Sequence, residues 1–197
     1  MTKIVLASHN NGKVREMNQI LKSCDMDVKS LSEFTDIEAE ETGLTFVENA
    51  IIKARHACQA SGLPAIADDS GLEVTALKGA PGIYSARYAG EKASDQQNLD
   101  KLLEALDDVE DDKRQARFQC LMVYMRHELD PVPLMVQGTW EGIITRSPQG
   151  DNGFGYDPVF FVPEKNCTSA QLDADIKNSL SHRGQALRQL VEAIQQL

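Results

Sequence analysis

Two adjacent carboxylates, Asp68 and Asp69, follow the small apolar run Ala65-Ile66-Ala67. Carboxylates at the end of a strand can hold a hard cation such as Mg²⁺, and one of them can act as a general base that activates water. The alternative is an Asp-rich turn that Gly71 closes. Because neighbouring like charges repel each other, the pair indicates a functional site more strongly than either residue alone.

A second candidate site is the polar segment Ser8-His9-Asn10-Asn11-Gly12-Lys13, between an expected strand and an expected helix. Backbone N–H groups and the positive end of a helix dipole can bind an anion there. Gly12 permits close approach of the backbone, and Lys13 adds a positive charge. The segment lacks the Gly-x-x-x-x-Gly-Lys-Ser/Thr pattern of a Walker loop. It therefore predicts phosphate contacts, with an ordinary turn as the alternative.

Three further groups carry chemistry. The acidic residues Glu38, Glu40 and Glu41 resemble a solvated loop, although one of them could be a second metal ligand. The loop Phe154-Gly155-Tyr156-Asp157-Pro158 could stack a nucleobase on an aromatic ring, unless both rings belong to the core. Lys177 and Ser181-His182-Arg183-Gly184 place cationic donors near a helix start, where cations are unfavourable unless an anion compensates them.

Hydrophobic periodicity predicts the elements that position these residues. We expect strands at Lys3–Ser8, Asp27–Leu31, Pro64–Ala67, Leu72–Leu77, Ala116–Arg126, Pro133–Thr145 and Pro158–Val162. We expect helices from Lys13 to Cys24, at Phe46–Ser61, after Ser94 through Leu106, at Ser169–Asp175 and from about Arg183. Helices and strands alternate early, and two long strands then follow each other, so the pattern predicts an α/β fold with a mixed sheet.

Composition limits the function classes. The chain has 197 residues, a net charge of −10 and no apolar stretch of the length that a membrane span requires. The acidic balance disfavours a nucleic-acid partner. We expect a cytoplasmic protein with no membrane contact. The well-separated cysteines Cys24, Cys58, Cys120 and Cys167 form no Cys-x-x-Cys motif, so buried thiols are expected rather than a zinc site.

In their order and spacing, these segments resemble the inosine triphosphate pyrophosphatase family of noncanonical purine nucleoside triphosphate pyrophosphatases. The resemblance spans essentially the whole chain. The segments that carry it are Ser8–Lys13, Glu40–Gly43 with Phe46–Ala50, Ala67–Gly71, Gly79–Gly82 with Tyr84–Arg87, Gly153–Pro158 and Ser181–Gly184. It implies Mg²⁺-dependent hydrolysis of ITP, dITP and XTP to the monophosphate and pyrophosphate, which clears deaminated purines from the nucleotide pool. It also implies a homodimer, and one domain over residues 1–197 with an elongated sheet and two lobes around a substrate cleft.

The resemblance also implies roles for individual residues. Asp69 would be the general base and a metal ligand, with Glu41 as the second ligand. The residues that would contact the substrate are Ser8, His9, Asn10, Asn11, Gly12, Lys13, Lys53, Ser70, Phe154, Gly155, Tyr156, Asp157, Lys177, His182 and Arg183. Phe154 would be the stacking ring. His9 departs from the small residue that is frequent at this position in the family, which puts the shape of the phosphate loop in question.

Two other functions use similar residues. A pyrophosphatase for modified pyrimidine nucleotides would differ in its base pocket, and a substrate panel separates it from the purine enzyme. A catalytically silent nucleotide-binding regulator would be favoured if the carboxylates were absent, but Asp68 and Asp69 are present.

Overall fold

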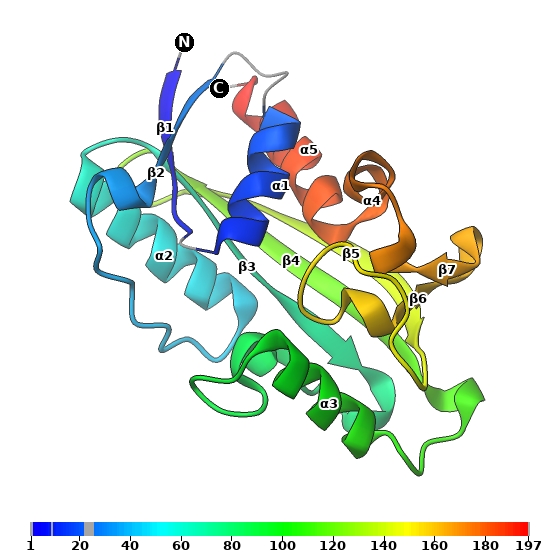
Figure 1. The fold of residues 1–197 in the computed structure, drawn as a ribbon. Coiled ribbons are helices and arrows are strands. Elements are labelled where there is room, and N and C mark those ends of the chain that lie inside the picture. Colours follow the sequence, from blue (N-terminus) through cyan, green and yellow to red (C-terminus); the bar gives the residue numbers. More distant parts are fainter. Residues whose placement is uncertain (1, 9, 22–25, 197) are drawn as a thin grey trace. The chain divides into compact units, whose positions relative to one another are not determined.

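A mixed sheet organises the chain. The computed structural model describes residues 2–8, 10–21 and 26–196, and these contain seven strands in the order β2-β1-β3-β4-β5-β6-β7 (Figure 1). The strands are β1 (Thr2–Leu6), β2 (Met26–Ser30), β3 (Ala65–Val74), β4 (Gln115–Met125), β5 (Leu134–Ile144), β6 (Phe160–Val162) and β7 (Cys167–Thr168). β1 is parallel to β2 and β3, whereas β6 is antiparallel to β5 and β7, so the predicted mixed α/β sheet is confirmed.

The helices of the described residues are α1 (Asn11–Leu21), α2 (Phe46–Ser61), α3 (Asp95–Ala105), α4 (Ala174–Leu180) and α5 (His182–Ile194). α2 has the predicted bounds. The Thr45 side chain accepts the N–H of Glu48 at its start, and Gly62 adopts a left-handed conformation with φ 68° at its end. α3 begins after Ser94, as predicted, and a capping box of Ser94 and Gln97 opens it. Cys24, which was predicted to end the first helix, lies outside the described residues.

The break predicted between the strands Pro64–Ala67 and Leu72–Leu77 is wrong, and so is the alternative of a turn at Asp68–Gly71. β3 continues without interruption from Ala65 to Val74, so the strands predicted on either side of the turn are one strand. In the sheet, β3 lies between β1 and β4, and its register with β1 joins Val5 to Ala65 and Leu6 to Ile66. Incorporation into a sheet overrides the local preference of Asp, Ser and Gly for a turn.

Other boundaries also differ from the predictions. The strand predicted to reach Leu77 ends at Val74, because Thr75–Leu77 forms a 3₁₀ turn. The strand predicted from Pro158 begins at Phe160, because Asp157–Val159 forms a 3₁₀ turn in which proline, which lacks an N–H, is tolerated. The helix predicted at Ser169–Asp175 is instead a 3₁₀ turn at Ser169–Gln171, followed by α4 from Ala174.

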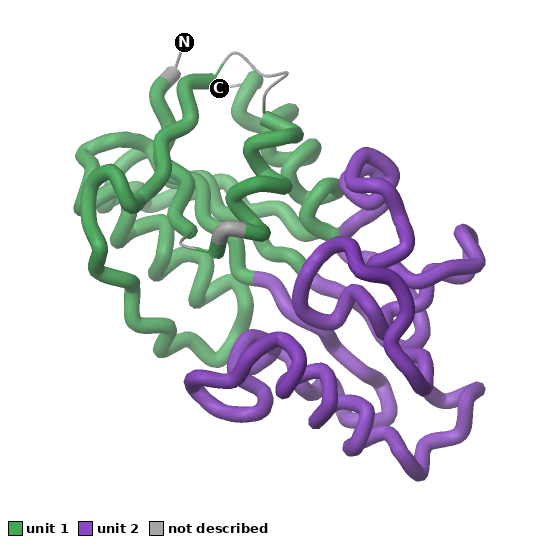
Figure 2. Tube along the Cα trace, viewed as in Figure 1, with its two compact units in different colours: residues 1–69, 120–138, 182–197 green, residues 70–119, 139–181 purple. Residues whose placement is uncertain are grey.

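The chain divides into two compact units (Figure 2). Unit 1 comprises Met1–Asp69, Cys120–Gly138 and His182–Leu197, and unit 2 comprises Ser70–Gln119 and Thr139–Ser181. The boundary therefore falls within β3, β4 and β5. The predicted arrangement of two lobes around a cleft in an elongated molecule stays a prediction.

Unit 1 has three layers, because successive side chains of a strand point to opposite faces. Ile4, Leu6 and Ile66 pack with apolar residues of α1 and α5. Val5, Ala7 and Ala65 pack on the other face with the alanines of α2. The sheet of this unit is therefore covered by α1 and α5 on one face and by α2 on the other.

Unit 2 has a single core, in which α3 packs on strand residues through Leu99 and Leu102. Phe160 lies in this core, with its ring centroid 4.5 Å from that of Phe118 and 5.2 Å from that of Trp140.

Cys58 and Cys120 are buried, as predicted, and burial raises their thiol pKa values to about 11 and about 12. Cys167 is half-buried. Among the residues that the structure describes, no helix combines the length and the apolar character of a membrane span.

Candidate functional site

Asp68 and Asp69 lie on opposite faces of β3. Both are buried, with 2% and 6% of their surface exposed. Asp68 has the parity of Ile66 and points toward α1 and α5, whereas Asp69 has the parity of Ala65 and Ala67 and points toward α2. The strand thus directs two adjacent carboxylates to opposite faces of the sheet.

Asp68 lies in a cluster of cations. Lys13 Nζ is 2.8 Å from Asp68 Oδ2, and Arg183 Nε is 3.7 Å from the same oxygen. Burial alone would raise the pKa of Asp68, but Lys13, Arg183 and Lys53 outweigh it and hold this pKa below its ordinary range. Glu16 on α1 forms a second ion pair with Arg183. Asp68 is therefore ionised and ties α1 to α5.

Two side chains of α2 hold Asp69 by hydrogen bonds. Lys53 Nζ lies 2.7 Å from Asp69 Oδ1, and Asn49 Nδ2 donates to Asp69 Oδ2 at 3.3 Å. Burial raises the pKa of Asp69, and the opposing effect of Lys53 and Lys13 does not cancel it. A buried carboxylate with a raised pKa is suited to take a proton from water.

Lys53 links the two predicted metal ligands. Its Nζ atom lies 3.1 Å from Glu41 Oε1 as well as 2.7 Å from Asp69 Oδ1. Burial opposes the charged form of Lys53, but Asp69, Asp68 and Glu41 raise its pKa above the ordinary value. The same ammonium therefore joins two carboxylates.

This pair of carboxylates fits Mg²⁺, which is commonly held by one or two carboxylates together with water and substrate phosphates. A metal site made by protein side chains alone would need further ligands close to these two carboxylates. Within residues 2–8, 10–21 and 26–196, no group of three His, Cys, Asp or Glu side chains is gathered for a metal ion. Glu41 and Asp69 could thus supply two ligands of a metal ion, and water or substrate phosphates would supply the others.

Asn10 caps α1 in the predicted phosphate segment. Its Oδ1 atom accepts the N–H groups of Gly12 at 2.9 Å and of Lys13 at 3.1 Å, and Ser8 Oγ accepts the N–H of Asn10 at 3.2 Å. A phosphate that uses the backbone donors of Gly12 and Lys13 must compete with this cap. His9 lies outside the described residues, and Asn11 is the first residue of α1.

In unit 2, the predicted aromatic loop is organised by Asp157, which is 3% exposed. Its Oδ2 atom accepts the N–H of Phe154 at 2.9 Å and contacts Lys177 Nζ at 2.7 Å, and its Oδ1 atom accepts the hydroxyl of Ser169 at 2.8 Å. A Cβ on Gly153 would lie 2.1 Å from Asp157 Oδ2, so glycine is required there. Asp157 therefore fixes both the loop and the Lys177 ammonium.

The two aromatic rings of this loop have different surroundings. Tyr156 is buried in the core of unit 2, and its hydroxyl donates to the carbonyl oxygen of Ser85 at 2.8 Å. Phe154 is half-buried, and Lys177 Nζ lies 5.1 Å from its ring centroid. Gly155 donates its N–H to Asp95 at 2.8 Å. Phe154 is thus the ring with a cationic donor beside it.

The predicted cationic set is divided between the units. Lys177 belongs to unit 2 with Asp157, whereas His182 and Arg183 open α5 in unit 1. At this helix start, the carboxylate of Glu16 compensates the positive charge of Arg183. Ser70, the next residue after Asp69 on β3, is half-buried. The substrate roles of all these residues stay predictions.

Sequence reasoning missed Glu16 and Asn49. Glu16 lies three residues after Lys13 on α1, and Asn49 lies four residues before Lys53 on α2. Both spacings place two side chains on the same helix face. This spacing from a predicted site residue is the signal that could have identified them.

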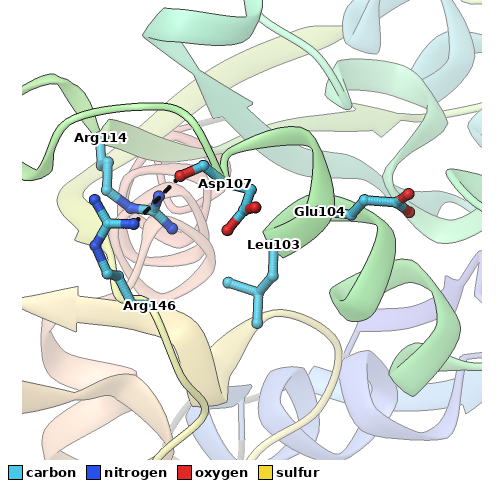
Figure 3. A pocket seen from close by; sticks show the side chains of 5 residues that line it. All are labelled: Leu103, Glu104, Asp107, Arg114 and Arg146. Carbon is cyan, nitrogen blue, oxygen red and sulfur yellow. Dashed lines mark hydrogen bonds between the residues drawn. The ribbon is translucent and has the colours of Figure 1, made fainter.

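Unit 2 has a surface cavity of about 250 Å³ near the end of α3, away from the loop that Asp157 organises (Figure 3). Its lining residues are Leu103, Glu104, Asp107, Arg114 and Arg146. Arg114 donates to the carbonyl oxygens of Leu106 at 2.6 Å and Ile144 at 2.8 Å, and Arg146 donates to that of Asp107 at 3.3 Å. These arginines fasten the end of α3 to neighbouring segments, and none of the predicted site residues lines the cavity.

Known proteins resemble this chain in sequence and in fold. A dITP/XTP pyrophosphatase from Vibrio cholerae serotype O1 is 62% identical over 196 residues, which cover 100% of this chain and 98% of the relative. One from Vibrio parahaemolyticus serotype O3:K6 is 63% identical over 190 residues, covering 96% and 95%. A solved HAM1 protein from Coxiella burnetii, 51% identical, covers 100% of both chains with a TM-score of 0.92. The Ham1 family model matches residues 4–193, and this chain is therefore a member of the Ham1 family.

Proposed function

We propose that this protein hydrolyses noncanonical purine nucleoside triphosphates, namely dITP, ITP and XTP, to the monophosphate and pyrophosphate. The observation that carries the proposal is the pair of carboxylates Asp69 and Glu41 around Lys53, in a unit that also holds Lys13 and Arg183. The names of its relatives also support the proposal. The Vibrio cholerae protein, 62% identical over 196 residues, is called a dITP/XTP pyrophosphatase.

Each residue has a defined task in this reaction. Asp69 takes a proton from the attacking water, whose oxygen then bonds to phosphorus. The bond between the α-phosphate and β-phosphate groups breaks, and pyrophosphate leaves. Lys13 and Arg183 neutralise phosphate charge, as phosphoryl transfer requires. Lys53, 2.7 Å from Asp69, keeps the carboxylate ionised until the proton arrives.

We further propose that Glu41 and Asp69 hold Mg²⁺. When bound, the ion supplies charge neutralisation and lowers the pKa of a bound water. The two carboxylates reach a common cation, the Lys53 ammonium, at 3.1 Å and 2.7 Å, which supports their use as paired ligands.

We assign recognition of the base to unit 2. Phe154 offers a half-buried ring for stacking, and Lys177, 5.1 Å from that ring, offers a donor for O6 of hypoxanthine or xanthine. Adenine carries an amino group at this position, so a donor would meet a donor and leave polar groups unpaired. Rejection of guanine requires a further contact to its 2-amino group.

A substrate panel tests the function. We expect the protein to release pyrophosphate from dITP, ITP and XTP much faster than from ATP, GTP and dUTP. Pyrophosphate and orthophosphate are assayed separately, and H₂¹⁸O shows whether the label enters the monophosphate or pyrophosphate. Preference for dUTP would favour the pyrimidine enzyme, orthophosphate alone would contradict the cleavage position, and no turnover would favour a regulator that only binds nucleotides.

We also infer that the protein is a homodimer, as its resemblance to the pyrophosphatase family implies. We infer that it acts in the cytoplasm without nucleic-acid partners, since its proposed substrates belong to the nucleotide pool. Sedimentation velocity over a range of protein concentrations tests the dimer. A single species of about 22 kDa at every concentration would contradict it, because one chain has a mass of 21.7 kDa.

A further inference from the structure

Asn49 is a fully buried polar side chain on a helix whose buried face is otherwise mostly alanine. It is 0% exposed, beside Ala50, Ala54 and Ala57. Asparagine is less favourable than alanine inside a helix, and a buried amide costs free energy unless its groups are hydrogen-bonded. The contacts of Asn49 must therefore account for its presence.

The Asn49 amide joins two parts of the candidate site. Nδ2 donates to Asp69 Oδ2 at 3.3 Å, and Oδ1 accepts the N–H of Gly43 at 2.9 Å. Lys53 holds the other oxygen of Asp69 at 2.7 Å. Because Asn49 and Lys53 are four residues apart on one helix face, their two contacts together fix the rotation of the Asp69 carboxylate.

Gly43 brings the neighbouring segment to within a distance that no other residue permits. A Cβ at this position would lie 2.6 Å from Asn49 Oδ1 and 2.6 Å from Glu48 Cβ. The next residue, Leu44, donates its N–H to Glu48 Oε2 at 2.9 Å. The segment that carries Glu41 is thus anchored two residues further along the chain.

We propose that Asn49 is a positioning residue that fixes the Asp69 carboxylate relative to the Glu41–Gly43 segment. This inference rests on the proposed function, in which Asp69 takes a proton and both carboxylates hold Mg²⁺. Asn49 acts through Asp69 and Gly43, with no task at the substrate. Without it, both carboxylates keep their charge but lose their fixed spacing. The chemical step then slows, while nucleotide binding through the cations is retained.

The test compares Asn49→Ala with Asn98→Ala. Asn98 on α3 is 2% exposed, donates to the carbonyl oxygen of Ala86 at 3.1 Å and accepts the N–H of Ala89 at 2.7 Å. It is a matched buried asparagine that also links two groups. We expect Asn49→Ala to lower kcat for dITP by about 10-fold to 100-fold with KM within about threefold, and Asn98→Ala to leave kcat within about threefold.

Hydrogen exchange gives a readout that does not depend on turnover. We expect the Gly43 amide to exchange faster in Asn49→Ala, because it loses its acceptor. Asn49→Asp separates the two contacts, since it keeps an acceptor for Gly43 but places a second carboxylate against Asp69. That variant should retain protection at Gly43 and lose kcat, and Gly43→Ala should lose kcat with Asn49 intact.

Unchanged exchange at Gly43 in Asn49→Ala would overturn the proposal. So would a kcat within about threefold of wild type, or an equal loss of kcat in Asn98→Ala. If Asn49→Ala does not fold, Asn49→Asp and Gly43→Ala carry the comparison. If the wild-type protein hydrolyses none of the panel, the proposed function fails, and hydrogen exchange alone decides whether Asn49 anchors the Glu41–Gly43 segment.

Discussion

The two faces of β3 at Asp68 and Asp69 place chemically identical side chains in different surroundings. On the α1 and α5 face, the cations Lys13 and Arg183 surround Asp68, and its pKa lies below the ordinary range. On the α2 face, Asp69 has one close ammonium and one amide, and burial raises its pKa. A difference of one residue along a strand thus separates a fixed counter-ion from a carboxylate that can take up a proton.

This difference assigns separate tasks to the pair. Asp68 holds together helices that bring Lys13 and Arg183 to the sheet, so its removal should first affect folding. Asp69 has a smaller part in cohesion, since Lys53 keeps Glu41 as a partner at 3.1 Å. Its removal should first affect turnover. Substituting each carboxylate separately tests whether Asp68 serves mainly folding and Asp69 mainly turnover.

The largest expected effect is that of Asp69→Asn on turnover. The amide keeps the size of the side chain but cannot accept a proton from water. We expect kcat for dITP to fall by about 10³-fold, within the range for loss of a general base, while the thermal unfolding curve stays close to that of the wild type. Pyrophosphate release and thermal unfolding measure the two quantities. Activity close to wild type would refute Asp69 as the base.

The second effect is that of Asp68→Asn on stability. Removing one partner of a buried ion pair leaves cations without their counter-charge, which costs about 3–5 kcal/mol in free energy of unfolding. Urea denaturation of Asp68→Asn and Asp69→Asn under the same conditions measures the difference. If Asp69→Asn lost more stability than Asp68→Asn, the tasks assigned to the two faces would be reversed.

The helix bounds and the type of sheet could be predicted from the sequence. The bounds of α2 could be predicted because its ends are set by residues close in sequence, namely Thr45 with Glu48 at the start and Gly62 at the end. The mixed sheet followed from the order of the elements, because helices and strands alternate early and two long strands then follow each other. The reaction did not follow from these residues alone, because an ordinary turn remained an alternative for both Ser8–Lys13 and Asp68–Gly71. The resemblance of the ordered segments to a known family implied it.

The separation of Asp68 from Asp69 could not be predicted, since it depends on neighbouring strands. Considered locally, Asp68–Gly71 has the composition of a turn, and only pairing within the sheet makes it part of a strand. The partners Glu16 and Asn49 were missed for a related reason. Arg183 is 167 residues from Glu16, and Asp69 is 20 residues from Asn49, so the folded sheet brings these pairs together.

The smallest effect concerns Asp130, a carboxylate of unit 1 that resembles Asp68 in its pairing and has no proposed task in catalysis. Arg126 donates to it through Nε at 2.8 Å and Nη2 at 2.5 Å, and the backbone N–H of Val132 donates at 3.1 Å. The Arg126 hydrogen bonds outweigh burial and hold the pKa of Asp130 below its ordinary range. We expect Asp130→Asn to lose about 1–3 kcal/mol at neutral pH with kcat unchanged.

The loss of stability in Asp130→Asn depends on pH. Because the pKa of Asp130 is lower in the folded protein than in the unfolded chain, its ionised form stabilises the fold above the unfolded value of about 4. This contribution disappears as pH falls through the folded pKa, so the stability difference between wild type and Asp130→Asn should shrink below about pH 4. Urea unfolding at a series of pH values measures it. If Asp68→Asn matched Asp130→Asn in losing stability while keeping kcat, Asp68 would be structural alone. A loss of kcat in Asp68→Asn only would instead show that its cations serve the reaction.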